Sequence, residues 1–201
     1  MFSGAQFSLY PMTSDFVPAI MGGIAALDTY KDRLRRETDD VSTLLVGPPD
    51  VVVDAMRDAF IATARSGHHV VLSATLSRGC PGESDDPICT APSIPRLAPG
   101  DDPVQAALRR YDPNPVSGIA CSGQISLYPL GTEAHMARIG SCIDFLKHVG
   151  VYDKPKHFCS KLRGDAGALF SAVACSYLDF APPEAHVVLT LTVSANSPSR
   201  F

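Results

Sequence analysis

The chain has no continuous apolar stretch that approaches the length of a membrane span, and its first residues lack the basic region and apolar run of a secretory signal. It also has little clustered positive charge. The net charge is −4, and the short basic clusters, at residues 33–36 and 109–110, have acidic residues close by. A nucleic-acid-binding surface needs more basic charge than this. These absences predict a cytoplasmic protein that neither inserts into a membrane nor binds nucleic acid.

Sequence signatures of catalysis and of metal binding are missing as well. The chain contains no G-x-S-x-G elbow, no phosphate-loop lysine motif, no dinucleotide glycine fingerprint and no H-E-x-x-H. Its six cysteines include no C-x-x-C pair, which favours reduced and mostly buried thiols over a metal site. A disulfide between Cys80 and Cys89, the one close pair, stays open. We therefore predict no catalytic residue, no metal and no cofactor.

What the chain does have is the same pattern twice. FSLYPM at residues 7–12 returns as ISLYPL, and HVVLSATLS at residues 69–77 returns as HVVLTLTVS. The serines of the first motif lie 118 residues apart and the histidines of the second 117, so the internal spacing is nearly unchanged. Such self-similarity indicates tandem copies of one module. We predict repeats at residues 1–82 and 120–201, joined by a proline-rich linker at residues 83–119.

Hydrophobic periodicity gives the same order of elements in both repeats. In the first, FSLYPM is typical of a strand, apolar residues recur at helical spacing over residues 16–27, and two short strands follow within residues 33–46. A helix at residues 51–65 and the HVVL strand complete the order β-α-β-β-α-β. This order predicts an α+β fold, a tandem duplication of the ferredoxin-like module, with antiparallel sheets and helices on one face. Within the linker, residues 103–110 have a helical pattern.

The closing strand of each repeat has one apolar and one polar face. The polar face carries hydroxyl side chains at every second position, at Ser73, Thr75 and Ser77 in the first copy and again in the second. A surface that faces solvent or another sheet is the favoured interpretation, because antiparallel sheets commonly have one. Direct contact with a ligand is the alternative.

Proline ends the SLYP motif of each repeat, on what is a central strand in this plan. Because Pro11 and Pro129 have no N–H to give to a ladder, we expect pairing to fail there and main-chain groups near Leu9 and Leu127 to be left free. A small planar heterocycle with donors and acceptors can bind such groups beside a neighbouring hydroxyl. The alternative is that proline simply ends the strand, and the residues by themselves leave both readings open.

The histidines offer no nucleophile–base pair. His69 and His186 recur in the two copies, but no carboxylate or cysteine repeats at a fixed spacing beside them. A residue duplicated at the start of a strand is more often structural. Both histidines are kept as candidate ligand contacts because they recur.

Several motifs taken together resemble the YkoF family of thiamine- and hydroxymethylpyrimidine-binding proteins. They are FSLYPM followed by SDF, VSTLL before a glycine turn, SRGCPGE after the closing strand, the second LYP, GDAGALFSAV and the terminal SANSPSR. The likeness spans both repeats in the same order and fails mainly in the linker. It implies a homodimer that binds thiamine or its pyrimidine precursor without altering it. It also implies a role in uptake and salvage of the pyrimidine, associated with an ABC-type importer.

The same resemblance assigns the ligand contacts. The SLY strand and the third-strand hydroxyl map onto both repeats, and with the recurrent histidines the candidate set is Ser8, Leu9, Tyr10, Thr43, His69, Ser126, Leu127, Tyr128, Ser160 and His186. The change from Thr43 to Ser160 implies two sites of unequal affinity. Two other hypotheses stay open: an enzyme of thiamine or pyrimidine metabolism that uses a histidine such as His69, and a ligand-free assembly module whose hydroxyl faces pair.

Overall fold

The structure is a computed structural model that describes residues 3–80, 102–114 and 116–199. The first repeat runs in the order β1 (Ser3–Pro11), α1 (Phe16–Ala26), a 3-10 turn (Leu27–Tyr30), β2 (Arg35–Thr38), β3 (Thr43–Val46), α2 (Pro49–Ala64) and β4 (Val70–Arg78). After helix α3 (Pro103–Arg110), the second repeat contains β5 (Ala120–Leu130), α4 (His135–His148), β6 (Tyr152–Pro155), β7 (Ser160–Asp165), α5 (Ala166–Asp179) and β8 (His186–Ala195). The order β-α-β-β-α-β predicted from the sequence is confirmed in both repeats.

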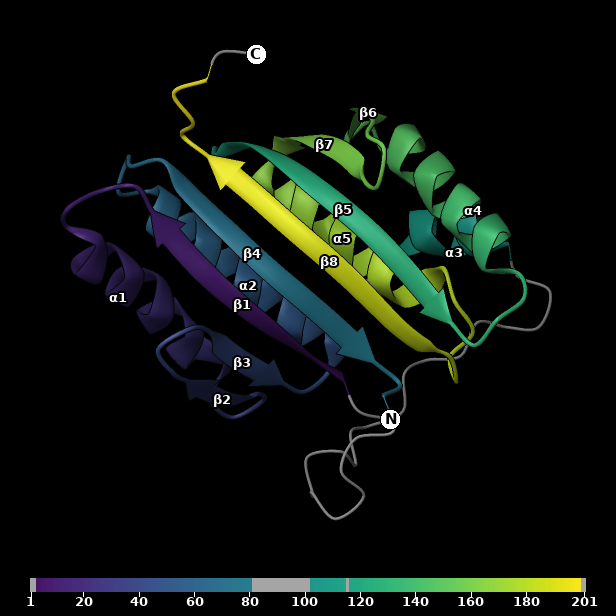
Figure 1. Ribbon diagram of the computed structural model, residues 1–201, viewed down its shortest axis with the longest axis horizontal. Coiled ribbons are helices and arrows are strands. Elements are labelled where there is room, and N and C mark those ends of the chain that lie inside the picture. Colours follow the sequence, from purple (N-terminus) through teal and green to yellow (C-terminus); the bar gives the residue numbers. More distant parts are fainter. Residues whose placement is uncertain (1–2, 81–101, 115, 200–201) are drawn as a thin grey trace.

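The eight strands of the described residues form one antiparallel sheet, in the order β2-β3-β1-β4-β8-β5-β7-β6. Each repeat contributes four neighbouring strands, and the two sets meet where β4 pairs with β8. In that ladder Ala74 lies opposite Leu191, its own counterpart 117 residues later. An approximate twofold axis therefore passes through this pair of residues. Figure 1 shows β4 and β8 side by side at the centre, with each repeat extending outward from them.

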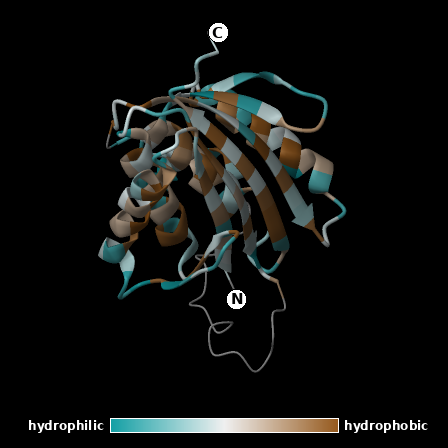
Figure 2. Ribbon diagram, turned by 60° about the vertical axis from the view of Figure 1, so that its left-hand side comes forward, coloured by the Kyte–Doolittle hydropathy of each residue, from teal (hydrophilic) through white to brown (hydrophobic). Residues whose placement is uncertain are grey.

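The helices cover one face of the sheet and leave the other bare, as Figure 2 shows from the side. Alternation along the strands accounts for this, since the helix-facing residues of β4 and β8 are buried and those between them are half-buried or exposed. We call the bare side the open face. Its centre carries the hydroxyl rows of the two closing strands and no charged side chain. In the described part of the chain, no helix combines the length and apolar character that crossing a membrane requires.

The two repeats share one core. The rings of Phe60 on α2 and Phe170 on α5 lie 5.7 Å apart between their centroids and join the two helix layers. Arg78, which is fully buried at the end of β4, reaches into the second repeat and donates to the carbonyl oxygens of Tyr177 at 2.9 Å and Leu178 at 3.3 Å. A buried guanidinium is tolerated only when its N–H groups are satisfied. These bonds therefore fix the second repeat against the first.

Helix α3 forms at the residues where the sequence predicts it. Asp102 caps its start, accepting from the Val104 N–H at 2.9 Å, and the helix packs against α4 and α5. Arg110 at its end donates to the buried Asp179 carboxylate at 3.0 Å. The helix therefore belongs to the layer that covers the second repeat, and nothing comparable covers the first repeat within the described residues.

Most of the described cysteines are buried free thiols. Burial raises the pKa of Cys121, Cys142 and Cys175 to about 12, so these thiols stay protonated near neutral pH. Cys80 and Cys159 are partly exposed free thiols. Cys89 lies outside the described residues, and with it the question of a disulfide to Cys80.

Close packing of α1 on α2 depends on one glycine and yields a stability prediction. A Cβ at Gly23 would overlap Thr63 Oγ1 and lie 3.0 Å from the Ala59 carbonyl oxygen, whereas a Cβ at Gly22 would meet nothing within 4 Å. Gly23→Ala should lower the free energy of unfolding by about 1–3 kcal/mol through overpacking. Gly22→Ala should raise it by about 0.5–1 kcal/mol because alanine favours the helix. Urea denaturation measures both, and equal effects of the two changes would contradict this packing.

Asp165 caps the start of α5 and yields a pH prediction. Its carboxylate accepts hydrogen bonds from Gly167 N at 2.7 Å, Gly118 N at 2.8 Å, and Ser117 Oγ at 2.9 Å and N at 3.0 Å. Desolvation by burial acts to raise the pKa of Asp165, but the hydrogen bonds led by those of Ser117 outweigh it and hold the pKa below its usual value.

Asp165→Ala should therefore lower the free energy of unfolding by about 1–2 kcal/mol near neutral pH, the typical cost of losing an N-cap. Because the pKa is lowered in the folded state, this stabilisation is complete above the unfolded pKa of about 4 and is lost as pH falls through the folded pKa. Urea denaturation at a series of pH values should show the difference from wild type shrinking in acid. Asp165→Asn, which keeps one acceptor oxygen, should cost less. A difference that is the same at every pH would contradict the assignment.

Candidate functional site

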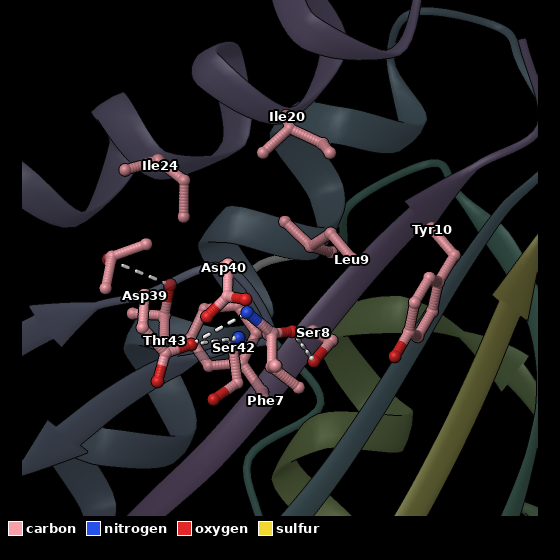
Figure 3. A pocket seen from close by; sticks show the side chains of 12 residues that line it. Phe7, Ser8, Leu9, Tyr10, Ile20, Ile24, Asp39, Asp40, Ser42 and Thr43 are labelled. Atoms are coloured by element: carbon pink, nitrogen blue, oxygen red, sulfur yellow. Dashed lines mark hydrogen bonds between the residues drawn. The ribbon is translucent and has the colours of Figure 1, made fainter.

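Two cavities occupy equivalent places in the two repeats. The first cavity, of about 270 Å³, is lined by residues 7–10 of β1, Ile20 and Ile24 of α1, and residues 38–43 between β2 and β3. The second cavity, also of about 270 Å³, is lined by residues 125–128 of β5, side chains of α4, and the segment between β6 and β7. Figure 3 shows the first, with Ile20 and Ile24 directed from α1 toward the strand that carries Leu9.

Each cavity exists because the third strand of the repeat is shorter than the first. β3 pairs with β1 only from Gly4 to Phe7, and β1 continues to Pro11 without a neighbour on that side. In the second repeat the pairing of β7 with β5 likewise stops at Ile125, while β5 continues to Leu130. One edge of each first strand is therefore open, and helix α1 or α4 stands over it.

The open edge presents main-chain groups to the cavity. In an antiparallel sheet a residue directs both its N–H and its C=O to the same neighbouring strand, alternately to one side and the other. Met12 faces the β4 side, since its N–H donates to His69 O at 2.8 Å, whereas Ser3 faces the β3 side, since its carbonyl oxygen accepts from Gly47 N at 3.1 Å. Leu9 therefore faces the β3 side, where β3 has ended. By the same alternation Leu127 faces the missing end of β7, since Ile119 O accepts from Ala166 N at 2.9 Å there.

The two prolines do not interrupt the ladder in the way that the sequence predicts. Pro11 pairs with Val70 of β4, and Pro129 pairs with Val187 of β8, so the expected failure of pairing is wrong on that side. Pro11 lies two residues after Leu9, and Pro129 lies two residues after Leu127, so the main-chain groups of each pair face the same side. The proline nitrogens therefore face the open edge. A missing N–H costs nothing there, because no strand is present to accept it. The free groups near Leu9 and Leu127 result from the short third strands.

Ser8 and Ser126 hold the loops that close the cavities. The Ser8 hydroxyl donates to the carbonyl oxygen of Val41 at 2.8 Å, and the Ser126 hydroxyl donates to that of Phe158 at 3.0 Å. The ladder to the third strand ends one residue earlier, at Phe7 and Ile125. These side-chain bonds hold the loop where a longer third strand would have continued the ladder. The two serines line the cavities and also fix the position of their outer walls.

The third-strand hydroxyls differ in their partners. Thr43 is 3% exposed, and its Oγ1 lies 3.0 Å from Thr38 Oγ1, with which it shares one hydrogen bond. The residue that corresponds to Thr38 in the second repeat is Pro155, which has no hydroxyl. Within the described residues the Ser160 hydroxyl has no hydrogen-bond partner. The two cavities thus offer similar hydroxyl groups, of which one is already hydrogen-bonded within the protein and the other is not.

The walls of the cavities are mainly apolar. Ile20 and Ile24, which helical spacing identifies as one face of α1, are only partly buried and form the first cavity's roof. Leu9 and Leu127 are buried, with exposures of 8% and 7%, while Tyr10 and Tyr128 are 49% and 45% exposed at the rims. An apolar cleft with a few directed polar groups is typical of a small-molecule site.

The two recurrent histidines lie outside both cavities. His69 Nε2 is 2.9 Å from Ser194 Oγ, and His186 Nε2 is 3.1 Å from Ser77 Oγ. The first bond joins the residue before β4 to β8, the second joins β4 to β8, and the two are related by the approximate twofold axis. The structure therefore brings together eight of the ten predicted site residues, four in each cavity, and places His69 and His186 on the seam between the repeats.

Sequence reasoning missed the loop residues that line the cavities. Asp39 and Asp40 line the first cavity, and Lys156 and Phe158 line the second. They lie on short segments without periodicity, so a pattern of apolar residues does not select them. Aligning the two repeats position by position through this loop would have marked them, because Asp39 and Asp40 of one copy correspond to a lysine and a histidine in the other.

The lining of the two cavities contains no histidine and no basic group paired with a hydroxyl or thiol. Nor do the described residues include three or more His, Cys, Asp or Glu side chains placed to hold a metal ion. What both cavities offer is an apolar slot beside free main-chain donors and acceptors. The arrangement can hold a flat polar ring and discriminate it by hydrogen bonds.

Comparison with known proteins gives two findings. A family model described as "YKOF-related Family" matches residues 2–83 and again residues 120–200. A protein of Bacillus subtilis (strain 168) with the name "Putative HMP/thiamine-binding protein YkoF" is 32% identical over 200 residues, which cover 98% of this chain and 92% of that protein. The two matched stretches each contain one complete set of β-α-β-β-α-β elements and one of the two equivalent cavities.

Proposed function

The chain belongs to the YkoF-related family, and on this premise we propose that it binds thiamine or its hydroxymethylpyrimidine precursor without converting it, one molecule in each repeat. The observation that carries the proposal is the open strand edge at Leu9 and Leu127, which ends in an apolar cavity in both repeats. The name of the Bacillus subtilis relative supports the choice of ligand.

The aminopyrimidine ring suits this edge. Liquid water occupies about 30 Å³ per molecule, so a cavity of about 270 Å³ has room for roughly ten non-hydrogen atoms. Hydroxymethylpyrimidine is about that size. Its ring nitrogen and amino group offer an acceptor and a donor side by side, which can pair with the N–H and C=O of one strand residue. Ile20 and Ile24 would cover one face of the ring.

Thiamine is larger, and its second ring would project beyond the inner cavity. The lining residues that are themselves exposed, such as Asp39, Asp40 and Tyr10, mark the mouth of the first cavity. The thiazolium would lie there. Because Thr43 already shares a hydrogen bond with Thr38 and Ser160 has no such partner, we propose that the two repeats bind with unequal affinity.

Binding without chemistry is preferred over an enzyme of thiamine or pyrimidine metabolism. The histidine of that alternative, His69, is hydrogen-bonded to Ser194 at 2.9 Å across the seam and does not line a cavity. No second acid or base recurs beside it. Incubation of thiamine with the protein should return thiamine unchanged by mass spectrometry.

The proposal extends to a cytoplasmic role in uptake and salvage of the pyrimidine, with an ABC-type importer of hydroxymethylpyrimidine as partner. Its support is the relationship to the YkoF-related family. A protein that holds the ligand without altering it is suited to passing it between a transporter and an enzyme.

Calorimetric titration tests the ligand. Thiamine and hydroxymethylpyrimidine should both bind, with up to two molecules per chain, and a pyridine analogue without the accepting ring nitrogen beside the amino group should bind more weakly. Thr43→Ala should weaken the first site by about 1 kcal/mol, the usual value of a buried hydrogen bond, which is roughly a fivefold loss of affinity. Thr75→Ala on the open face is the matched control and should leave both affinities unchanged. Absence of heat and of any thermal shift with both ligands would refute the proposal.

We further propose that a second copy of the chain covers the open face. The face carries uncharged hydroxyl rows on β4 and β8 that are related by the approximate twofold axis, and a twofold dimer requires a self-complementary surface of this kind. Side chains that lie on it or at its rim include the exposed Tyr10 and Tyr128. The ligand-free assembly reading uses the same contact but leaves the cavities without a role.

Sedimentation equilibrium tests this contact. The chain has a mass of 21.4 kDa, and the protein should sediment as twice that mass. Thr75→Lys places a charge at the centre of the open face and should shift the equilibrium to monomer, since an unpaired buried charge is strongly unfavourable. Thr29→Lys, at an exposed position in the 3-10 turn, is the control and should remain dimeric. A monomer at every concentration for the wild-type chain would contradict the proposal.

A further inference from the structure

The loops that close the two cavities carry opposite charge. In the first repeat the segment between β2 and β3 contains Asp39 and Asp40, and the corresponding positions 117 residues later are Lys156 and His157. All four side chains are exposed. The adjoining strands change in the same direction, since Glu37 on β2 corresponds to Lys154 on β6, and Leu44 on β3 corresponds to Lys161 on β7.

The first cavity is acidic. Asp39 Oδ1 accepts hydrogen bonds from the N–H groups of Ser42 and Val41, each at 2.8 Å, and these bonds hold the pKa of Asp39 below its usual value. Its carboxylate is therefore ionised near neutral pH. No lysine, arginine or histidine lines this cavity. On the adjoining strand β2, Arg35 pairs with Glu37 and Arg36 pairs with Asp28 at 3.0 Å, so their charges are already matched by acids.

The second cavity is basic, and it adjoins a further hollow. This outer cavity, of about 820 Å³, is lined in part by Lys154, Lys156 and His157, and it shares Lys156 and Cys159 with the second cavity. No aspartate or glutamate lines either one. The nearest acid in sequence, Asp153, forms an ion pair with Lys161, in which Nζ and Oδ2 are 3.2 Å apart. Among the described residues neither Lys154 nor Lys156 has an ion-pair partner.

We infer that the two cavities select forms of the same pyrimidine that differ in charge: the first takes the form with a cationic substituent, and the second takes a phosphate ester. The inference rests on the proposed function, since the ring itself would lie in the inner cavity of either repeat. A phosphate on the exocyclic methylene of the ring would extend into the outer cavity, where lysine ammonium groups can donate to its oxygens. A phosphate monoester carries a charge of about −1.5 to −2 at neutral pH.

Repulsion contributes to the selection in addition to attraction. A phosphate at the first mouth would face Asp39 and Asp40, and a thiazolium at the second would face Lys156. Because like charges repel, each of these contacts would oppose binding. Discrimination between two similar ligands commonly uses a repulsive element of this kind. Lys161 does not add to this effect, because Asp153 neutralises it. The two repeats would thus divide related ligands between them.

The test is calorimetric titration of the full chain with three probes that share the ring: hydroxymethylpyrimidine, which is neutral, its phosphate ester, and thiamine. Lys156→Asp should weaken binding of the phosphate ester by about tenfold, because one attraction becomes a repulsion near the surface. The neutral ring should change by less than about twofold. Lys31→Asp makes the same change of charge at an exposed position that lines neither the first, the second nor the outer cavity, and it should alter no affinity.

The reciprocal variant addresses the first cavity. Asp40→Lys should weaken thiamine binding several-fold and leave the neutral ring unaffected, and Asp32→Lys is its charge-matched control. Raising the salt concentration roughly tenfold should weaken binding of the phosphate ester and of thiamine but not of the neutral ring, because salt screens exposed charges.

Cys159 assigns each ligand to its cavity. This partly exposed thiol lines the second cavity, whereas burial raises the pKa of Cys121, Cys142 and Cys175 to about 12 and leaves them unreactive. Alkylation followed by peptide mapping should show that the phosphate ester protects Cys159 at lower concentration than thiamine does.

Two results would overturn the inference, and they are distinguishable. Binding of all three probes with equal affinity at the Cys159 site, unchanged in Lys156→Asp, would refute the charge selection and leave the proposed function standing. Absence of binding by any of the three probes would refute the proposed function and the inference together.

Discussion

The pairing of β4 with β8 is the contact on which the rest of the structure depends. Each repeat by itself would leave its closing strand as a long exposed edge, which invites uncontrolled association. Antiparallel pairing removes both edges at once, turns two four-stranded sheets into one sheet of eight strands, and sets the approximate twofold axis at Ala74 and Leu191. Arg78 on the helix-covered face, and the hydrogen bonds of His69 and His186 on the open face, join the two repeats along this same pair of strands. The two closing strands then lie between the two cavities and keep them apart.

Each cavity follows from a mismatch in strand length. β1 has nine residues and β3 has four, and in the second repeat β5 has eleven and β7 six. The chain thereby leaves a strand edge unpaired beneath a helix, where main-chain donors and acceptors would be unfavourable without a partner. A ligand with complementary groups would supply that partner. Ser8 and Ser126 keep the neighbouring loops in place, and the loops are then free to differ in charge between the repeats.

Much of this arrangement could be predicted from local pattern. The order of elements, the helix at Pro103–Arg110 and the buried face of β4 follow from periodicity and capping, which act over a few residues. The free groups at Leu9 and Leu127 were expected, but for the wrong reason. Pro11 stays in the ladder with Val70 because its nitrogen faces the open edge, and that direction depends on where β3 ends. The apolar face of α1 was also identified, although part of it lines a cavity.

The sequence by itself determined the duplication, the class of fold and the family resemblance. It also indicated which residues of the first and third strands are candidates to line a cavity. All of these follow from repeated motifs and short-range periodicity. Only the tertiary structure decided that the two repeats share one sheet, that His69 and His186 belong to the seam, and that Asp39 and Lys156 stand at the mouths of equivalent cavities. The physical reason is that these relations join residues more than a hundred positions apart or lie in loops without periodicity. Strand register and the ends of short strands, which no local pattern encodes, set them.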